Sequence, residues 1–93
     1  MIIDWTEPTL TDLAHLRNYI RDRNPDAAEA IASLVDSAVS NLAEFPNAGR
    51  PGRSPGTREL VLPRASVIIP YRIRGERLEI LAVIHMSRRW PPT

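Results

Sequence analysis

The first half of the chain carries an apolar strand-like start and then apolar residues at helical spacing. Met1 to Trp5 is short and apolar-rich, which predicts a first strand. Thr6 or Thr9 can cap the helix that follows, and Pro8 suits its first turn, where a missing N–H costs nothing. One apolar stripe at helical spacing then follows, made by Leu10, Leu13, Leu16 and Ile20. We expect this helix to end near Arg23.

A second helix is predicted from Asn24-Pro25 to about Phe45. Asn caps a helix N-terminus and Pro fits its first position, while Asp26 and Glu29 place negative charge where the helix dipole favours it. The i, i+3/i+4, i+7 pattern runs through Ala27, Ile31, Leu34, Val35, Ala38, Val39 and Leu42. Because the link between the two helices is very short, they should form an antiparallel hairpin.

The second half of the chain has the composition of loops and strands. Residues 46–56 hold three Pro and three Gly, which excludes regular structure. From Thr57 the period becomes that of strands, predicted over residues 58–62, 67–74 and 78–86. Pro70 cannot donate a ladder hydrogen bond, so we expect a bulge or a locally unpaired side there.

These elements predict one α+β domain over residues 1–93. A helical hairpin packs on a small antiparallel sheet, and the order of elements is βααβββ. The length of the chain fits one small domain with one modest hydrophobic core.

The last predicted strand has apolar residues on both of its faces. One face carries Leu78, Ile80, Ala82 and Ile84, and the other carries Glu79, Leu81, Val83 and His85. A sheet covered by helices on one side should be more polar on its other side. The excess indicates either a partner surface that includes Leu81, Val83 and His85 or a sheet that curves around its own loop.

Charge divides the chain into two unlike halves. All twelve basic residues are Arg. Residues 1–47 hold three Arg and eight Asp or Glu, whereas residues 48–93 hold nine Arg and three Glu, so a net charge of +1 separates into −5 and +6. Arginine binds phosphate and carboxylate bidentately. The second half therefore predicts a surface for an anionic or acidic partner, or it reflects an arginine-rich composition without a functional role.

Composition excludes several classes of site. The chain has no cysteine, so disulfides and thiolate metal sites are excluded. Its two histidines, His15 and His85, are far apart and lack metal-ligand spacing. No apolar run approaches the roughly 18 residues that span a bilayer. We expect a cytoplasmic protein that needs no cofactor.

Short segments after the helical hairpin form a recurring combination. They are Phe45-Pro46, Gly49-Arg50-Pro51-Gly52-Arg53, Gly56-Thr57-Arg58-Glu59-Leu60, Ile69-Pro70-Tyr71-Arg72-Ile73, Ile80-Leu81-Ala82-Val83-Ile84-His85 and Arg88-Arg89-Trp90-Pro91. With the Asn24-Pro25 break, this combination resembles the RelE/ParE superfamily, the small toxins of type II toxin–antitoxin modules. The resemblance covers nearly the whole chain. It implies a cytoplasmic bacterial toxin that a tightly bound antitoxin neutralises within a hetero-oligomer.

The resemblance leaves two targets open. RelE-like members cut messenger RNA in the ribosomal A site, whereas ParE-like members poison DNA gyrase. The two groups share a fold, and fold does not fix function.

Metal-independent RNA cleavage needs an activated 2′-OH, a stabilised phosphorane-like dianion and a protonated leaving oxygen. RelE-like toxins meet this need with Lys and Arg plus a Tyr or His near the C-terminus. This chain has no Lys and no Tyr after Tyr71. What remains is His85, a residue type that often serves as a general acid or base, and four candidate phosphate clamps, Arg58, Arg72, Arg88 and Arg89. Glu59 and Glu79 are possible partners for arginines, although Arg58 and Glu59 are adjacent and so point to opposite faces.

The incomplete ribonuclease set favours gyrase inhibition over messenger RNA cleavage. Target contacts are then expected from Arg58, Arg72, Arg88, Arg89 and Trp90. Antitoxin contacts are expected from Leu81, Val83 and His85. If the chain is a ribonuclease, its catalytic candidates are His85, Arg72 and Arg89. A binding module without a target of its own, kept only for complex formation, is a third possibility.

Overall fold

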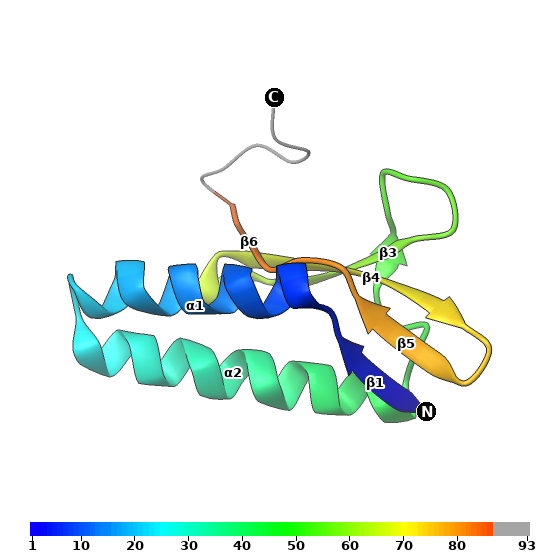
Figure 1. The fold of residues 1–93 in the computed structure, drawn as a ribbon, viewed down its shortest axis with the longest axis horizontal. Helices are drawn as coiled ribbons and strands as arrows, with labels where there is room; N and C mark the ends of the chain where they lie inside the picture. The colour runs from blue at the N-terminus through cyan, green and yellow to red at the C-terminus, as the bar shows by residue number, and fades with distance from the viewer. Residues whose placement is uncertain (87–93) are drawn as a thin grey trace.

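Two helices cover one face of a sheet in this protein (Figure 1). The structure is a computed structural model and describes residues 1–86. Strand β1 (Ile2–Trp5) leads into helices α1 (Glu7–Arg21) and α2 (Pro25–Glu44). Asn24 is the N-cap of α2, where its side chain accepts the Ala27 N–H at 3.2 Å. The sequence prediction of a strand and a helical hairpin is confirmed.

The remaining strands complete a mixed sheet. They are β2 (Arg50–Pro51), β3 (Arg58–Leu62), β4 (Val67–Arg74), β5 (Arg77–Ile80) and β6 (Ile84–His85). The strand order is β1-β5-β4-β3-β2, and β6 pairs with β4. The predicted α+β class is confirmed, but the expectation that residues 46–56 lack regular structure is wrong, because β2 lies within them and pairs with β3. The sheet is mixed because β1 pairs with β5 in parallel, whereas β3, β4 and β5 form the predicted antiparallel meander.

The hydrophobic core lies between the helices and the central strands. Val67, Ile69 and Tyr71 of β4 are fully buried, and so are Leu78 and Ile80 of β5. The helices contribute Leu16, Val35, Val39 and Leu42. These helical positions belong to the two apolar stripes that the sequence predicts.

The strand predicted over residues 78–86 is interrupted by a bulge opposite Pro70. Tyr71 pairs with Ile80 and Ile68 pairs with Ile84, so three residues, 81–83, face two residues of β4. Leu81 donates its N–H to the Pro70 carbonyl at 2.9 Å, but proline has no N–H to return the bond. The expectation of a bulge or a locally unpaired side at Pro70 is confirmed in its first form, with the extra residue in the strand opposite Pro70. The single inserted residue reverses the alternation of side chains in β6.

Side chains from α1 bind the backbone of this bulge. Strand β1 ends at Trp5, the Cα partner of Ile80, so the Ile80 carbonyl lies where the parallel ladder ends. The Thr6 and Thr9 hydroxyls both donate to this carbonyl, at 2.6 and 2.7 Å. Thr6 was a candidate helix cap and is the N-cap residue, but its hydroxyl makes no capping bond.

The carboxylate of Asp12 completes this attachment one turn further along α1. Its Oδ2 accepts the Val83 N–H at 3.1 Å. Thr9 is fully buried, so its hydroxyl would be costly to leave unpaired. The first turns of α1 are therefore fixed to the bulge by polar contacts. We call Thr6, Thr9 and Asp12 the α1 clamp.

We expect the two threonines of the α1 clamp to act together. Thr6→Val and Thr9→Val should each lower the free energy of unfolding by about 0.5–1.5 kcal/mol, the usual net value of a hydrogen bond. The double variant should lose more than the sum, because only then does the Ile80 carbonyl lose both hydroxyl donors. Urea unfolding at equilibrium measures these differences. Thr11→Val, at an exposed position of the same helix, is the control. Losses no larger than that of the control would contradict the prediction.

Candidate functional site

The loop that follows α2 is anchored by a buried tyrosine. The Tyr71 hydroxyl donates to the Pro46 carbonyl at 2.7 Å and accepts the Gly49 N–H at 2.8 Å. A Cβ on Gly49 would lie 2.7 Å from the Tyr71 ring and 2.9 Å from the Glu59 carbonyl oxygen. The backbone at residue 49 can approach Tyr71 this closely only because it carries no side chain.

Arg58, a predicted target-binding residue, helps to hold the same loop. Its guanidinium donates to the Gly49 carbonyl at 2.8 Å and to the Asn47 carbonyl at 3.3 Å. Its Cα partner is the buried Tyr71, so it lies on the helix-facing side of the sheet. The structure therefore gives Arg58 a role in loop position, and its role in target binding stays a prediction.

Two carboxylates on the other face of the sheet hold arginines. Glu59 is buried and accepts both Nε and an Nη of Arg50, at 3.1 and 3.0 Å. Arg58 and Glu59 do point to opposite faces, as predicted from their adjacency. Glu79 accepts Arg72 Nε at 2.6 Å and lies 3.7 Å from Arg74 Nε.

The ionised form of Glu79 is favoured by its arginine neighbours. The hydrogen bond from Arg72 lowers the pKa of the Glu79 carboxyl, and this effect outweighs the opposing desolvation. The positive charges of Arg72, Arg74 and Arg77 lower the pKa further. Glu79 is therefore a partner of Arg72, as the sequence suggested. Glu79 thus forms ion pairs with Arg72 and Arg74 and is also close enough to Arg77 to feel its positive charge.

His85 lies on the opposite side of the sheet from the face that alternation predicted. Its Cα partner is Val67, which belongs to the hydrophobic core. Val83, two residues earlier, is also in that core. The prediction that Val83 points outward is therefore wrong, because the bulge shifts the alternation by one residue. Leu81, within the bulge, is half-buried.

The two catalytic candidates within residues 1–86, His85 and Arg72, are not brought together. His85 pairs with Val67 on the helix-facing side, whereas Arg72 reaches Glu79 on the other face. Val67 and Arg72 are five positions apart on β4, about 16 Å at about 3.3 Å per residue. The third catalytic candidate, Arg89, lies outside the described residues, as do the predicted target-binding residues Arg88 and Trp90.

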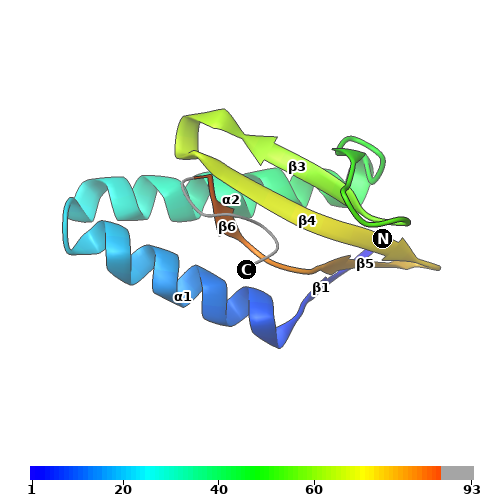
Figure 2. The same cartoon turned by 90° about the horizontal axis from the view of Figure 1, so that it is seen from above.

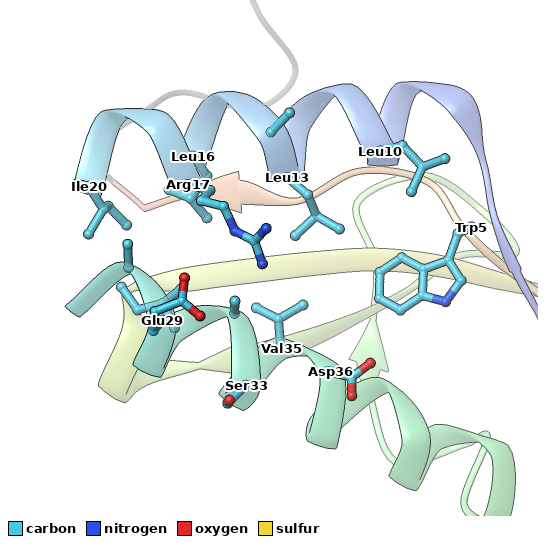
Figure 3. A pocket seen from close by; sticks show the side chains of 14 residues that line it. Trp5, Leu10, Leu13, Leu16, Arg17, Ile20, Glu29, Ser33, Val35 and Asp36 are labelled. Atoms are coloured by element: carbon cyan, nitrogen blue, oxygen red, sulfur yellow. The ribbon is translucent and has the colours of Figure 1, made fainter. Parts of the chain in front are cut away.

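An apolar groove between α1 and α2 was not predicted from the sequence. Its volume is about 630 Å³. Figure 3 shows Trp5 at one end, with Leu10, Leu13 and Ile20 of α1 facing α2. The charged residues that line the groove are Arg17, Glu29 and Asp36. Leu10 is 52% exposed, although the apolar stripe placed it with the core residues of the first helix. The sequence signal for this groove was that the apolar stripe of the first helix extends as far as Leu10, beyond the residues that reach the core.

Among residues 1–86, no cluster of His, Asp and Glu has the grouping of a metal site. In the same part of the chain, no helix is both long and apolar enough to cross a membrane.

Comparison with known proteins agrees with this architecture. Residues 3–90 match the family model described as the ParE toxin of the type II toxin–antitoxin system parDE. The Y4kP protein of Sinorhizobium fredii is 46% identical over 96% of this chain and 92% of its own length. Toxin RelE2 of Caulobacter vibrioides is 31% identical over 90% of this chain and 93% of its own length.

A solved structure has the same fold. It is described as the chromosomal ParDE TA system from P. aeruginosa, and it superposes with a TM-score of 0.82 at 27% identity. The match covers 91% of this chain and 95% of that chain. Helices, sheet and family model thus agree over nearly the whole sequence, and the chain belongs to the ParE toxin family of type II toxin–antitoxin systems.

Proposed function

We propose that this toxin arrests growth by inhibiting DNA gyrase in the cytoplasm and that its cognate antitoxin neutralises it. The observation that carries the proposal is the separation of His85 from Arg72 on opposite faces of the sheet. A ribonuclease needs its acid/base group and its phosphate clamp within hydrogen-bond reach of one substrate. The absence of Lys from the sequence points the same way.

Ribosome-dependent cleavage of messenger RNA is the second candidate. Two relatives at 31% identity bear RelE names, and the second half of the chain is rich in arginine. In that reading, His85, Arg72 and Arg89 would have to meet on the substrate. The pairing of Arg72 with Glu79 leaves that side chain oriented toward the far face from His85.

The two targets are separated by parallel assays on purified toxin. We expect inhibition of gyrase supercoiling, and no codon-phased cuts when primer extension is run on translated messenger RNA. His85→Ala should inhibit gyrase as strongly as the wild type, because His85 has no part in the proposed contact. A ribonuclease that lost its acid/base would slow about 10²–10⁴-fold. Codon-phased cleavage that disappears in His85→Ala, with unaffected gyrase, would overturn the assignment.

The groove between α1 and α2 is the surface that we propose for the antitoxin. The expected contacts at Leu81, Val83 and His85 relied on an outward apolar face, and Val83 is in the core. The groove instead has an apolar lining from the exposed Leu10 along α1 to the half-buried Ile20, about 15 Å at about 1.5 Å per residue. This length suits about three turns of a partner helix, which is a common way to bind an amphipathic segment.

The charged residues that line the groove predict which charges the antitoxin helix carries beside its apolar stripe. Glu29 and Asp36 on α2 would pair with basic residues of the antitoxin, and Arg17 on α1 with an acidic one. Trp5 closes one end and supplies a large aromatic contact, a residue type that often dominates binding energy. The occupant is therefore an antitoxin helix with an apolar stripe and both signs of charge.

Leu10→Glu tests the groove. The substitution should weaken antitoxin binding at least tenfold, because it places a charge against apolar contacts, and about 1.4 kcal/mol corresponds to each factor of ten. Stability should change little, since the side chain is 52% exposed in the free toxin. Phe45→Glu is the matched control, because Phe45 is also exposed but does not line the groove. Calorimetric titration with the antitoxin gives both affinities, and equal affinities for the two variants would refute this site.

A further inference from the structure

The loop between β2 and β3 is a stiff, arginine-bearing projection. It extends from the sheet in Figure 1. Within it, Gly52 donates its N–H to the Thr57 carbonyl at 2.8 Å, and the Thr57 hydroxyl donates to the Ser54 carbonyl at 2.6 Å. A Cβ on Gly52 would lie 2.2 Å from the Thr57 hydroxyl oxygen, so a larger residue there would displace this hydroxyl from its bond to Ser54. The loop is therefore closed by hydrogen bonds from its own backbone and from the Thr57 side chain.

A second arginine pair stands at the end of the β4–β5 hairpin. Arg74 and Arg77 are direct Cα partners, and both are exposed. Like charges placed opposite each other in an antiparallel pair destabilise it. The nearby carboxylate, Glu79, is hydrogen-bonded to Arg72 at 2.6 Å and also lies 3.7 Å from Arg74 Nε, so it offsets part of this repulsion. Three arginines still outnumber the two carboxylates at this end of the hairpin, Glu76 and Glu79, and the remaining positive charge suits an anion.

These two arginine-bearing segments lie at the same end of the molecule. Figures 1 and 2 both place the β2–β3 loop and the β4–β5 turn away from the turn that joins α1 to α2. Residues 45–58 contain three Arg and no acidic residue. We call this end, with Arg50, Arg53, Arg74 and Arg77, the arginine tip.

We propose that the arginine tip binds the phosphate backbone of duplex DNA. In the inhibited state, the partner at this surface would then be the DNA held by gyrase, a step that rests on the function proposed above. The segregation of charge supports this orientation, because the −5 of residues 1–47 would keep the helical layer away from DNA.

The chemistry of the tip favours duplex DNA over single-stranded RNA or protein. Residues 50–57 consist of Arg, Pro, Gly, Ser and Thr, and residues 74–77 of Arg, Gly and Glu. Binding of single strands uses aromatic side chains on which bases stack, and these segments have none. A protein interface needs an apolar centre, which they also lack. Arginine on a polar, stiff support suits contacts to phosphates, which need no base readout.

Fluorescence polarisation with a labelled 20-base-pair duplex tests the proposal on the purified toxin without gyrase. Affinity is measured over a salt series for the wild type, Arg53→Gln and Arg74→Gln/Arg77→Gln. The control is Arg21→Gln/Arg23→Gln, which removes the same charge from the end of the helical layer, where Arg21 binds Asn18 and Arg23 lies over the Tyr19 ring. Circular dichroism melting confirms that each variant is folded.

We expect the slope of log affinity against log salt to fall by about 2 in Arg74→Gln/Arg77→Gln and by about 1 in Arg53→Gln, since each phosphate contact contributes about 0.9. The control should keep the wild-type slope. Equal slopes for the two double variants would overturn the proposal, and so would tighter binding of a single-stranded RNA of equal length.

The supercoiling assay separates this proposal from the proposed function. Duplex binding with the expected slopes but without gyrase inhibition would leave the tip as a DNA-binding surface and refute gyrase as the target. Gyrase inhibition without duplex binding would refute the DNA contact and leave gyrase itself as the partner of the arginines.

Discussion

The attachment of α1 to the bulge after β5 determines how the two layers of this protein fit together. The Thr6 and Thr9 hydroxyls converge on the Ile80 carbonyl, and the Asp12 carboxylate holds the Val83 N–H. These groups lie at the point where β1 ends and where Pro70 has no hydrogen to offer. A buried backbone that leaves its ladder must find other partners. The first turns of α1 supply them, and this fixes the helix against the sheet.

The bulge decides which residues each face of the sheet presents. One inserted residue turns Val83 into the core and aligns His85 with Val67 on the helix-facing side. The same shift aligns Ile84 with Ile68 on the outer face, which also carries the ion pairs of Glu59 and Glu79 with arginines. If side chains alternated strictly along residues 78–86, His85 would share the outer face with Arg72, either as a catalytic partner or as part of a partner surface. The register of β6 supports neither arrangement.

The protein therefore separates its two proposed interactions in space. The helical layer offers an apolar groove with charged residues along it, which suits an amphipathic helix. The far end of the sheet offers arginines on a stiff polar loop and a tight hairpin turn, which suits phosphate. Tyr71 and Arg58 connect the β2–β3 loop to the core through carbonyls of residues 46–49. The shape of that loop is consequently coupled to the packing of the central strand.

The sequence by itself determined the helical hairpin, the meander and the bulge at Pro70, because each depends on local periodicity or on the missing proline donor. It also determined the division of charge between the halves. Tertiary structure alone decided which face of the sheet the residues after the bulge present. It also decided the parallel pairing of β1 with β5 and the exposure of Leu10 beside the groove. Sequence spacing specifies which side chains share a face of one element. It does not specify which face a strand presents after a one-residue insertion, or how far two helices stand apart, because contacts between distant segments set both.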